Sequence, residues 1–245
     1  MFCMHEIMNF LRCIFSNFHH YPDIIFYKSL VLLHKFFRKV SIRQLRYDKC
    51  LVGTSCFFLA AKIEDCPVKL IDLAVLYHKA ELKRNNWPMK MPSEQQKFQI
   101  QSKICEMESE ILRQIGFDLE IELPYKYFKL FADYPAPNMS KILQTASCFC
   151  NDNFLKPMCI YYHPMQIACS CIYFATLFFK TTLPDNEGKV WYKYLNEGIE
   201  LKHLQDVTEI MKVIYKKMEE RKRQMEKRAA AQSATAQSKP TNGNA

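Results

Sequence analysis

Two charged residues stand where the sequence pattern predicts apolar side chains. Lys62 follows the stretch from Leu51 to Ala61, whose apolar and small residues we expect to form a fully buried helix. Glu108 lies four residues from both Ile104 and Leu112, on the apolar stripe of another expected helix. A carboxylate removed from water needs a partner, and Lys62 is the obvious one. The pair is therefore either an internal salt bridge that sets the register of two helices or the polar centre of a docking surface.

The cysteines and histidines lack the spacing of a metal site or a catalytic site. The eleven cysteines include the pairs Cys148/Cys150 and Cys169/Cys171, each one residue apart, but no Cys-x-x-Cys. We interpret them as free thiols that pack as small apolar residues in a reducing compartment. The seven histidines show no ligand spacing, and the five glycines form no phosphate-binding loop. The sequence therefore predicts no metal, no cofactor, no small-molecule substrate and no catalytic residues.

A basic run follows the last apolar stripe of the chain. Between residues 212 and 228, lysines and arginines outnumber acidic residues and supply +5 of the formal net charge of +9. One interpretation is a solvated helix end, because cations suit a helix C-terminus. The other is a nuclear-import signal or an RNA contact. The residues that would make this contact are Lys216, Lys217, Arg221, Lys222, Arg223, Lys227 and Arg228.

Helical periodicity and proline breakers predict an all-α fold around these residues. Apolar residues recur at intervals of three and four, and prolines separate the periodic runs. This pattern predicts about ten helices in one or two domains. No stretch is long and apolar enough for a membrane span, and the N-terminus lacks the pattern of a signal peptide. The segment from Ala229 onward has no periodicity, and we expect it to be disordered.

The two halves of the chain are interpreted as copies of one helical unit. Ser55–Ala60 resembles Ser170–Ala175 at an offset of 115 residues, and at this offset Leu177 corresponds to Lys62. The second half therefore has an apolar residue where the first has a charge, which indicates that the charge serves a task of the first half. We divide the chain into two all-α domains and a basic, low-complexity tail, at residues 1–122, 123–220 and 221–245.

The residues around Lys62 resemble the central-helix signature of the cyclin box. The matching residues are Phe58-Leu59-Ala60-Ala61-Lys62-Ile63-Glu64, with His34-Lys35-Phe36-Phe37 at the end of the preceding helix. Ile115-Gly116-Phe117-Asp118-Leu119 resembles the end of the fifth cyclin helix. The segment from Asn186 to Tyr194 resembles the one before the last helix in cyclins of the T, K and L type.

The resemblance implies a fold and a partner. It implies two consecutive five-helix cyclin-box domains, followed by a basic helix end and a disordered tail. In cyclins, the lysine and glutamate at the places of Lys62 and Glu108 hydrogen-bond the backbone of a kinase. The implied function is a nuclear, non-catalytic activator of a cyclin-dependent serine/threonine kinase of the transcription class, bound as a heterodimer in the regulation of RNA polymerase II transcription. The implied kinase-binding residues are Lys62, Ile63, Glu64, Glu108, Leu112 and Phe117.

Two other classes of protein fit an all-α double repeat. A general transcription factor of the TFIIB type has two cyclin-like folds and binds promoter DNA. Such a factor would have basic residues spread over its second repeat, whereas the basic residues here concentrate near the C-terminus. The other class is a helical scaffold that binds no kinase. Binding of a kinase distinguishes the cyclin interpretation from both.

Overall fold

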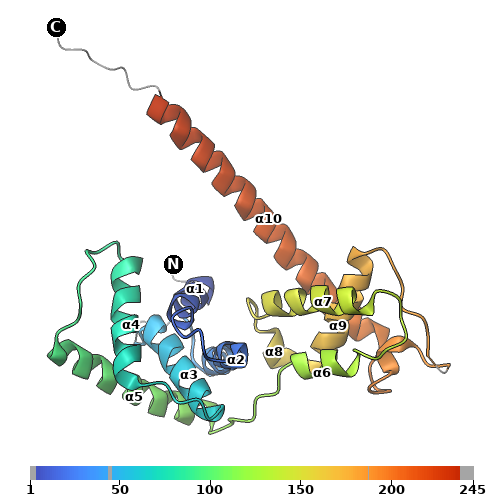
Figure 1. Cartoon of the computed structure of the whole chain (residues 1–245), viewed down its shortest axis with the longest axis horizontal. Helices are drawn as coiled ribbons and strands as arrows, with labels where there is room; N and C mark the ends of the chain where they lie inside the picture. The colour runs from blue at the N-terminus through green and yellow to red at the C-terminus, as the bar shows by residue number, and fades with distance from the viewer. Residues whose placement is uncertain (1–3, 44–45, 187, 238–245) are drawn as a thin grey trace.

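The molecule is built from helices arranged in two groups (Figure 1). This computed structural model describes residues 4–43, 46–186 and 188–237, without the side chains of residue 221 and residues 227–237. No strand occurs within these ranges. The described helices of the first half are α1 (Met4–Phe15), α2 (Asp23–Lys39), α3 (Lys49–Ile63), α4 (Leu70–Arg84) and α5 (Glu94–Ile115). Those of the second half are α6 (Tyr125–Leu130), α7 (Met139–Asn153), α8 (Met158–Tyr161), α9 (Pro164–Phe178) and α10 (Leu201–Gln237), with a 3-10 turn at Trp191–Lys193. The predicted all-α fold, with five helices in each half, is confirmed.

Helix α3 is the centre of the first helical group because its residues leave it no polar face. Every residue from Cys50 to Ala61 is buried, and α1, α2 and α5 pack around it. Gly53 permits the close crossing of α1, since a Cβ there would lie 2.9 Å from Cγ2 of Ile7. The Asp48 side chain begins the helix by accepting hydrogen bonds from backbone N–H groups of its first turn. A charge on this helix therefore has room only at its ends.

Helix α9 has the equivalent place in the second helical group. It begins and ends 115 residues after α3, and it is buried from Ile167 to Ile172. Helices α7 and α10 pack against α9, as α2 and α5 pack against α3. The internal repeat is therefore confirmed in the positions and contacts of the helices.

Helix α10 extends well beyond the second group (Figure 1). Its last buried side chain among those described is Ile214. The basic helix end predicted from the sequence is part of this extension. The helix then continues to Gln237, into the segment for which we expected disorder, because the alanines at 229–231 have the highest intrinsic helix propensity. The rest of that segment, residues 238–245, lies outside the described residues.

Helix α2 joins the two groups. The Nε2 atom of His34 lies 2.9 Å from the backbone oxygen of Phe154. The ring of Tyr27 packs against the rings of Tyr125 and Phe154, at centroid distances of 5.0 and 5.1 Å. Burial lowers the pKa of His34, and the hydrogen bond to the carbonyl opposes this only in part. The junction thus contains a histidine that is stable in its neutral form.

We predict that the free energy of unfolding falls as the pH is lowered from near 7 to near 5, and that His34→Gln removes part of this dependence. Because the folded pKa of His34 lies below the ordinary imidazole value of about 6.5, the unfolded chain takes up a proton first as the pH falls. One such proton contributes at most about 1.4 kcal/mol per pH unit. Urea unfolding at several pH values measures the effect. The same pH dependence in both proteins would contradict the prediction.

Candidate functional site

Lys62 and Glu108 form an ion pair between the end of α3 and the middle of α5. The Nζ atom of Lys62 lies 2.7 Å from Oε1 and 2.9 Å from Oε2 of Glu108. Glu108 is only 8% exposed, whereas the side chain of Lys62 is 46% exposed. The pairing expected from the sequence is therefore present, and it lies at the molecular surface with its cation open to solvent.

An aromatic ring supports the ammonium group of Lys62. Phe58 lies one helical turn earlier, and the Lys62 Nζ is 4.3 Å from its ring centroid. The electrostatic quadrupole of the ring stabilises a cation in this position. The Ser55 hydroxyl donates to the backbone oxygen of Ile104, which ties α3 to α5 one turn before Glu108. Phe58 was not among the expected site residues. Its position four residues before Lys62 on one helix could have indicated the contact, because side chains at this spacing are neighbours.

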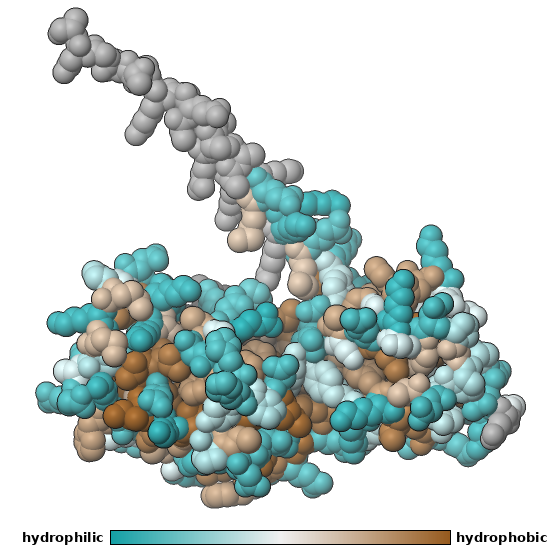
Figure 2. Space-filling model, in the orientation of Figure 1, coloured by the Kyte–Doolittle hydropathy of each residue, from teal (hydrophilic) through white to brown (hydrophobic). Residues whose placement is uncertain are grey.

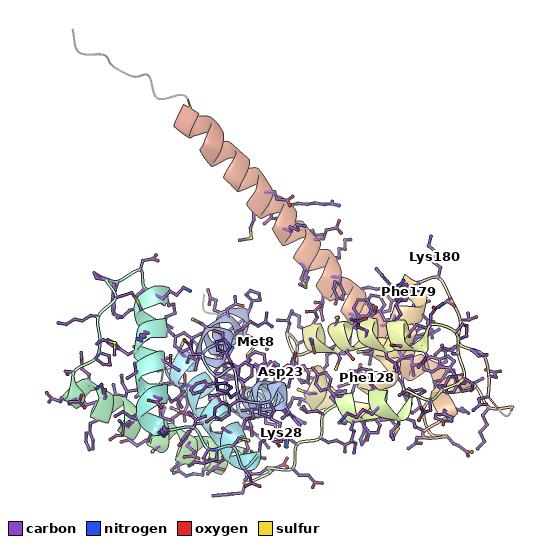
Figure 3. The ribbon with its side chains drawn as sticks, viewed as in Figure 1. Met8, Asp23, Lys28, Phe128, Phe179 and Lys180 are labelled. Atoms are coloured by element: carbon purple, nitrogen blue, oxygen red, sulfur yellow. The ribbon has the colours of Figure 1, made fainter. Side chains whose placement is uncertain are left out.

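Glu64, the residue that caps α3, is already paired within the molecule. It forms an ion pair with Lys28 of α2, which Figure 3 shows at the lower edge of the first helical group. Ile63, between Lys62 and Glu64 in the sequence, is half-buried. Glu64 therefore holds the end of α3 against α2. Any contact with a partner would use the lone pairs of its carboxylate that Lys28 leaves free.

The turn after α5 presents an exposed aromatic ring. Gly116 ends the helix in the left-handed conformation, with φ of 68°, and Phe117 follows with φ of 56°. Phe117 is 68% exposed. The Nζ atom of Lys35 holds this turn against α2 by donating to the Asp118 carboxylate at 2.8 Å. Leu112, one turn after Glu108 on the same helix face, is half-buried. Apolar side chains therefore follow the ion pair along α5 to its end.

This arrangement has the donors and acceptors needed to bind a peptide backbone. An ammonium group has three N–H donors, and Glu108 accepts from Lys62 through both of its oxygens. A third donor and several carboxylate lone pairs remain for an incoming backbone carbonyl and N–H group. Hydrogen bonds beside apolar side chains are stronger and more dependent on geometry than those in water. The pair thus suits recognition of a polypeptide.

The second helical group has no such pair at the corresponding positions. Leu177, which corresponds to Lys62, is 42% exposed, and the neighbouring Phe178 is 65% exposed. The position corresponding to Glu108 is Arg223, far along α10, where it forms an ion pair with Glu219 at 2.6 Å. The two groups share a fold, but the charge pair belongs to the first group alone.

The cysteines and histidines of the described residues form no site. No group of His, Cys, Asp or Glu side chains in the described ranges is arranged to hold a metal ion, and the cysteines there form no disulfide. Burial raises the pKa of Cys50, Cys159 and Cys169 to about 12, so these thiols stay protonated at neutral pH. Within the same ranges, no helix combines the length and the apolar character needed to cross a bilayer.

The basic run lies on α10 beyond the second helical group. Its described side chains are exposed, namely Lys216, Lys217, Lys222 and Arg223. The side chains of Arg221, Lys227 and Arg228 lie outside the described residues. The run is separate from the residues of the first group discussed above.

Comparison with protein families gives a match in each half of the chain. The family described as cyclin, N-terminal domain, matches residues 4–120. The family described as Cyclin-T2-like, C-terminal domain, matches residues 137–214. The chain belongs to the cyclin family. The two matched segments of this cyclin correspond to its two helical groups.

The relatives of this cyclin include members of the T and L types. It is 27% identical to Cyclin-T1-4 of Arabidopsis thaliana over 195 residues, which are 79% of this chain and 35% of the relative. It is 27% identical to Cyclin-L1-1 of Arabidopsis thaliana over 70% of this chain and 41% of the relative. It is 26% identical to Cyclin-L1 of Homo sapiens, over 66% of this chain and 31% of the relative. The chain thus spans about a third to two fifths of the length of these relatives.

Two solved structures contain a chain of similar fold. One is the CAK complex from Chaetomium thermophilum bound to ATP-gamma-S, with a TM-score of 0.57, 13% identity, and coverage of 84% of this chain and 60% of the other. The other is the yeast TFIIK complex of Kin28, Ccl1 and Tfb3, with a TM-score of 0.52, 16% identity, and coverage of 85% and 84%. At these identities the likeness concerns the fold.

We predict that the two halves of the ion pair differ in their cost of removal. Lys62→Met leaves a buried carboxylate without its cation, whereas Glu108→Gln leaves a lysine that reaches water. Lys62→Met should therefore lower the free energy of unfolding by about 1–3 kcal/mol. Glu108→Gln should lower it by less than about 1 kcal/mol. Chemical denaturation of both variants measures the difference. A larger cost for Glu108→Gln would show that the carboxylate is not the desolvated partner.

Proposed function

We propose that this cyclin is the regulatory subunit of a cyclin-dependent serine/threonine kinase of the transcription class, which it binds as a heterodimer and activates. The observation that carries the proposal is the Lys62–Glu108 pair, whose cation is exposed beside apolar side chains. An internal bridge that only set helix register would need neither an exposed cation nor an exposed Phe117. Both features suit a surface that a partner covers.

The docking face in this proposal lies on the first helical group. We assign residues 1–122 to a kinase-docking domain, 123–220 to a second cyclin-like domain and 221–245 to the tail. The absence of an equivalent pair at Leu177 in the second group supports one kinase for each cyclin. The proposed contact residues are Lys62, Ile63, Glu64, Glu108, Leu112 and Phe117.

The proposed mechanism is a population shift in the kinase, with no catalysis by the cyclin. An isolated cyclin-dependent kinase holds its glutamate-bearing helix away from the catalytic lysine. A cyclin that binds only the inward position of that helix stabilises the active arrangement by its differential affinity. Conversion from a mostly inactive to a mostly active population needs about 5 kcal/mol. An interface of standard size, about 1,600 Å², is able to supply this.

The comparisons support a kinase-containing assembly in transcription. The fold neighbours come from a CAK complex bound to ATP-gamma-S and from TFIIK, and the relatives are T-type and L-type cyclins. The match of the second half to the Cyclin-T2-like family argues against the TFIIB-type alternative. We propose a nuclear role in RNA polymerase II transcription, to which the exposed basic run of α10 contributes as an import signal or an RNA contact.

We predict that Glu108→Ala and Lys62→Ala each abolish kinase binding while the protein stays helical. The matched control is Lys126→Ala, which removes a lysine of α6 from its ion pair with Glu122, in the segment that precedes α6. Co-precipitation of the full chain with a panel of recombinant cyclin-dependent kinases measures binding, and thermal unfolding measures the folded fraction. The docking hypothesis would be contradicted if both site variants lost much of their thermal stability but their folded fraction still bound the kinase.

We predict that the part of the basic run beyond residue 220 is dispensable for kinase activation. Removal of residues 221–245 should leave activation intact, because the described part of this segment contributes nothing to the core. It should reduce nuclear accumulation or the salt-sensitive retention of RNA. Removal of residues 229–245 alone is the matched control. It should change neither kinase activation nor nuclear accumulation and RNA retention. Unchanged localisation and unchanged RNA retention in the shorter protein would leave the run as a solvated helix end.

A further inference from the structure

A groove opens between the two helical groups at the base of α10. It consists of two adjoining hollows of about 430 and 520 Å³, both of which are lined by Met4, Leu155 and Lys156. Its walls come from α1, the end of α2, α8 and α10. None of the proposed kinase-binding residues lines it, so the groove is separate from the proposed kinase-docking face; it shares Lys217 and Lys222 with the basic run of α10.

The floor of the groove is apolar, and part of it is open to solvent. Figure 2 shows apolar surface that continues from the base of α10 into the space between the two groups. Tyr161 is 68% exposed, Met218 is 40% exposed and Met225 is 71% exposed. Ile214, Met218 and Met225 recur at helical spacing, so the apolar stripe of α10 continues past the end of its own core. Flexible methionine side chains adapt readily to an apolar ligand.

The rim of the groove is strongly basic. Its exposed cations are Arg38, Arg43, Lys156, Lys217 and Lys222. Glu226 is the one carboxylate among the residues that line the two hollows. Among the described residues, none of the five cations forms an ion pair; the guanidinium of Arg38 lies 6.0 Å from the ring centroid of Tyr161. The groove therefore has a rim with a clear excess of positive charge.

This charge is a property of the groove and not of the junction as a whole. Another hollow, of about 710 Å³, lies beside the segment that links the two groups. Figure 3 shows two of its residues, Asp23 and Lys28. Its charges are balanced, since its lining includes Lys28, Lys126 and Lys129 together with Asp23, Glu120 and Glu122.

We propose that the groove binds an acidic, amphipathic segment of a partner protein. Leucine, isoleucine, phenylalanine or methionine side chains of that segment would cover the floor and remove its apolar surface from water. Aspartate and glutamate side chains beside them would pair with the rim, speed the encounter and select against neutral or basic segments. A nucleic acid would use the cations but would leave most of the methionine-rich floor uncovered. The floor therefore favours a protein segment.

The chain provides a matched pair of variants for a test. Lys217 and Lys222 line the groove. Lys216 and Arg223 lie on the opposite side of α10 from Met218 and Met225, as the helical repeat of 3.6 residues requires. Lys217→Glu/Lys222→Glu and Lys216→Glu/Arg223→Glu change the net charge of the whole protein by the same amount. Only the first double variant changes the groove.

The experiment selects random peptides of about 14 residues, displayed on phage, on the full chain. Each enriched sequence is synthesised with a fluorescent label, and its affinity is measured by fluorescence anisotropy. We expect enriched peptides with net negative charge and large apolar residues. We expect their affinity to fall at least about tenfold in the groove variant and less than about twofold in the control variant. Circular dichroism checks that both variants keep their helices.

Three results would overturn the proposal. The first is that the enriched peptides are neutral or basic. The second is that the enriched peptides bind both double variants with the same affinity. The third is that no peptide is enriched more strongly on the wild-type chain than on the groove variant. A fluorescent oligouridine measured on the same three proteins serves as the nucleic-acid arm. If oligouridine loses affinity in the groove variant and no peptide enriches, the basic rim is a nucleic-acid surface instead.

Discussion

The complete burial of α3 determines where the first helical group can carry charge. The residues of this helix from Cys50 to Ala61 are all buried, so its first solvent-accessible side chain at the C-terminal end is Lys62. The same packing brings α5 against α3 and buries Glu108, whose carboxylate then requires a cation. The central position of α3 and the ion pair at its C-terminal end are therefore consequences of one packing arrangement. The proposed docking site depends on that arrangement because, in the described contacts, each of the two charges has its ion-pair partner in the other.

Helix α2 connects this site to the rest of the molecule through consecutive residues. His34 reaches across to the backbone of Phe154 in the second group, and Lys35 holds the turn that carries Phe117. Phe36 is fully buried in the first group. Each side chain points in a different direction because successive residues of a helix are about 100° apart. One short sequence motif therefore fixes the orientation of the second group, the end of α5 and the packing of the first core.

Much of the fold was predictable from the sequence, whereas the surfaces were not. The periodicity predicted the helices, and the similarity of Ser55–Ala60 to Ser170–Ala175 predicted the equivalence of α3 and α9. The pairing of Lys62 with Glu108 followed from the cost of a lone buried carboxylate. The pairing of Glu64 with Lys28 did not, because it depends on how α2 crosses α3 and leaves no local pattern. The groove at the base of α10 was also not predictable from the sequence, because the residues that line it come from segments that are distant in the chain.

We propose that Lys62 and Glu108 are a recognition pair rather than an internal bridge, and a charge swap separates these roles. The double variant Lys62→Glu/Glu108→Lys keeps two opposite charges at the same edge of α3 and α5, so it can restore a bridge. It reverses the positions of donor and acceptor that a kinase backbone would meet. The measurement is the affinity of the swapped protein for the kinase that the wild-type chain binds, alongside its free energy of unfolding. We predict that the swap recovers stability relative to the single variants but does not recover kinase binding. Recovery of binding together with stability would show that the pair acts only within the cyclin.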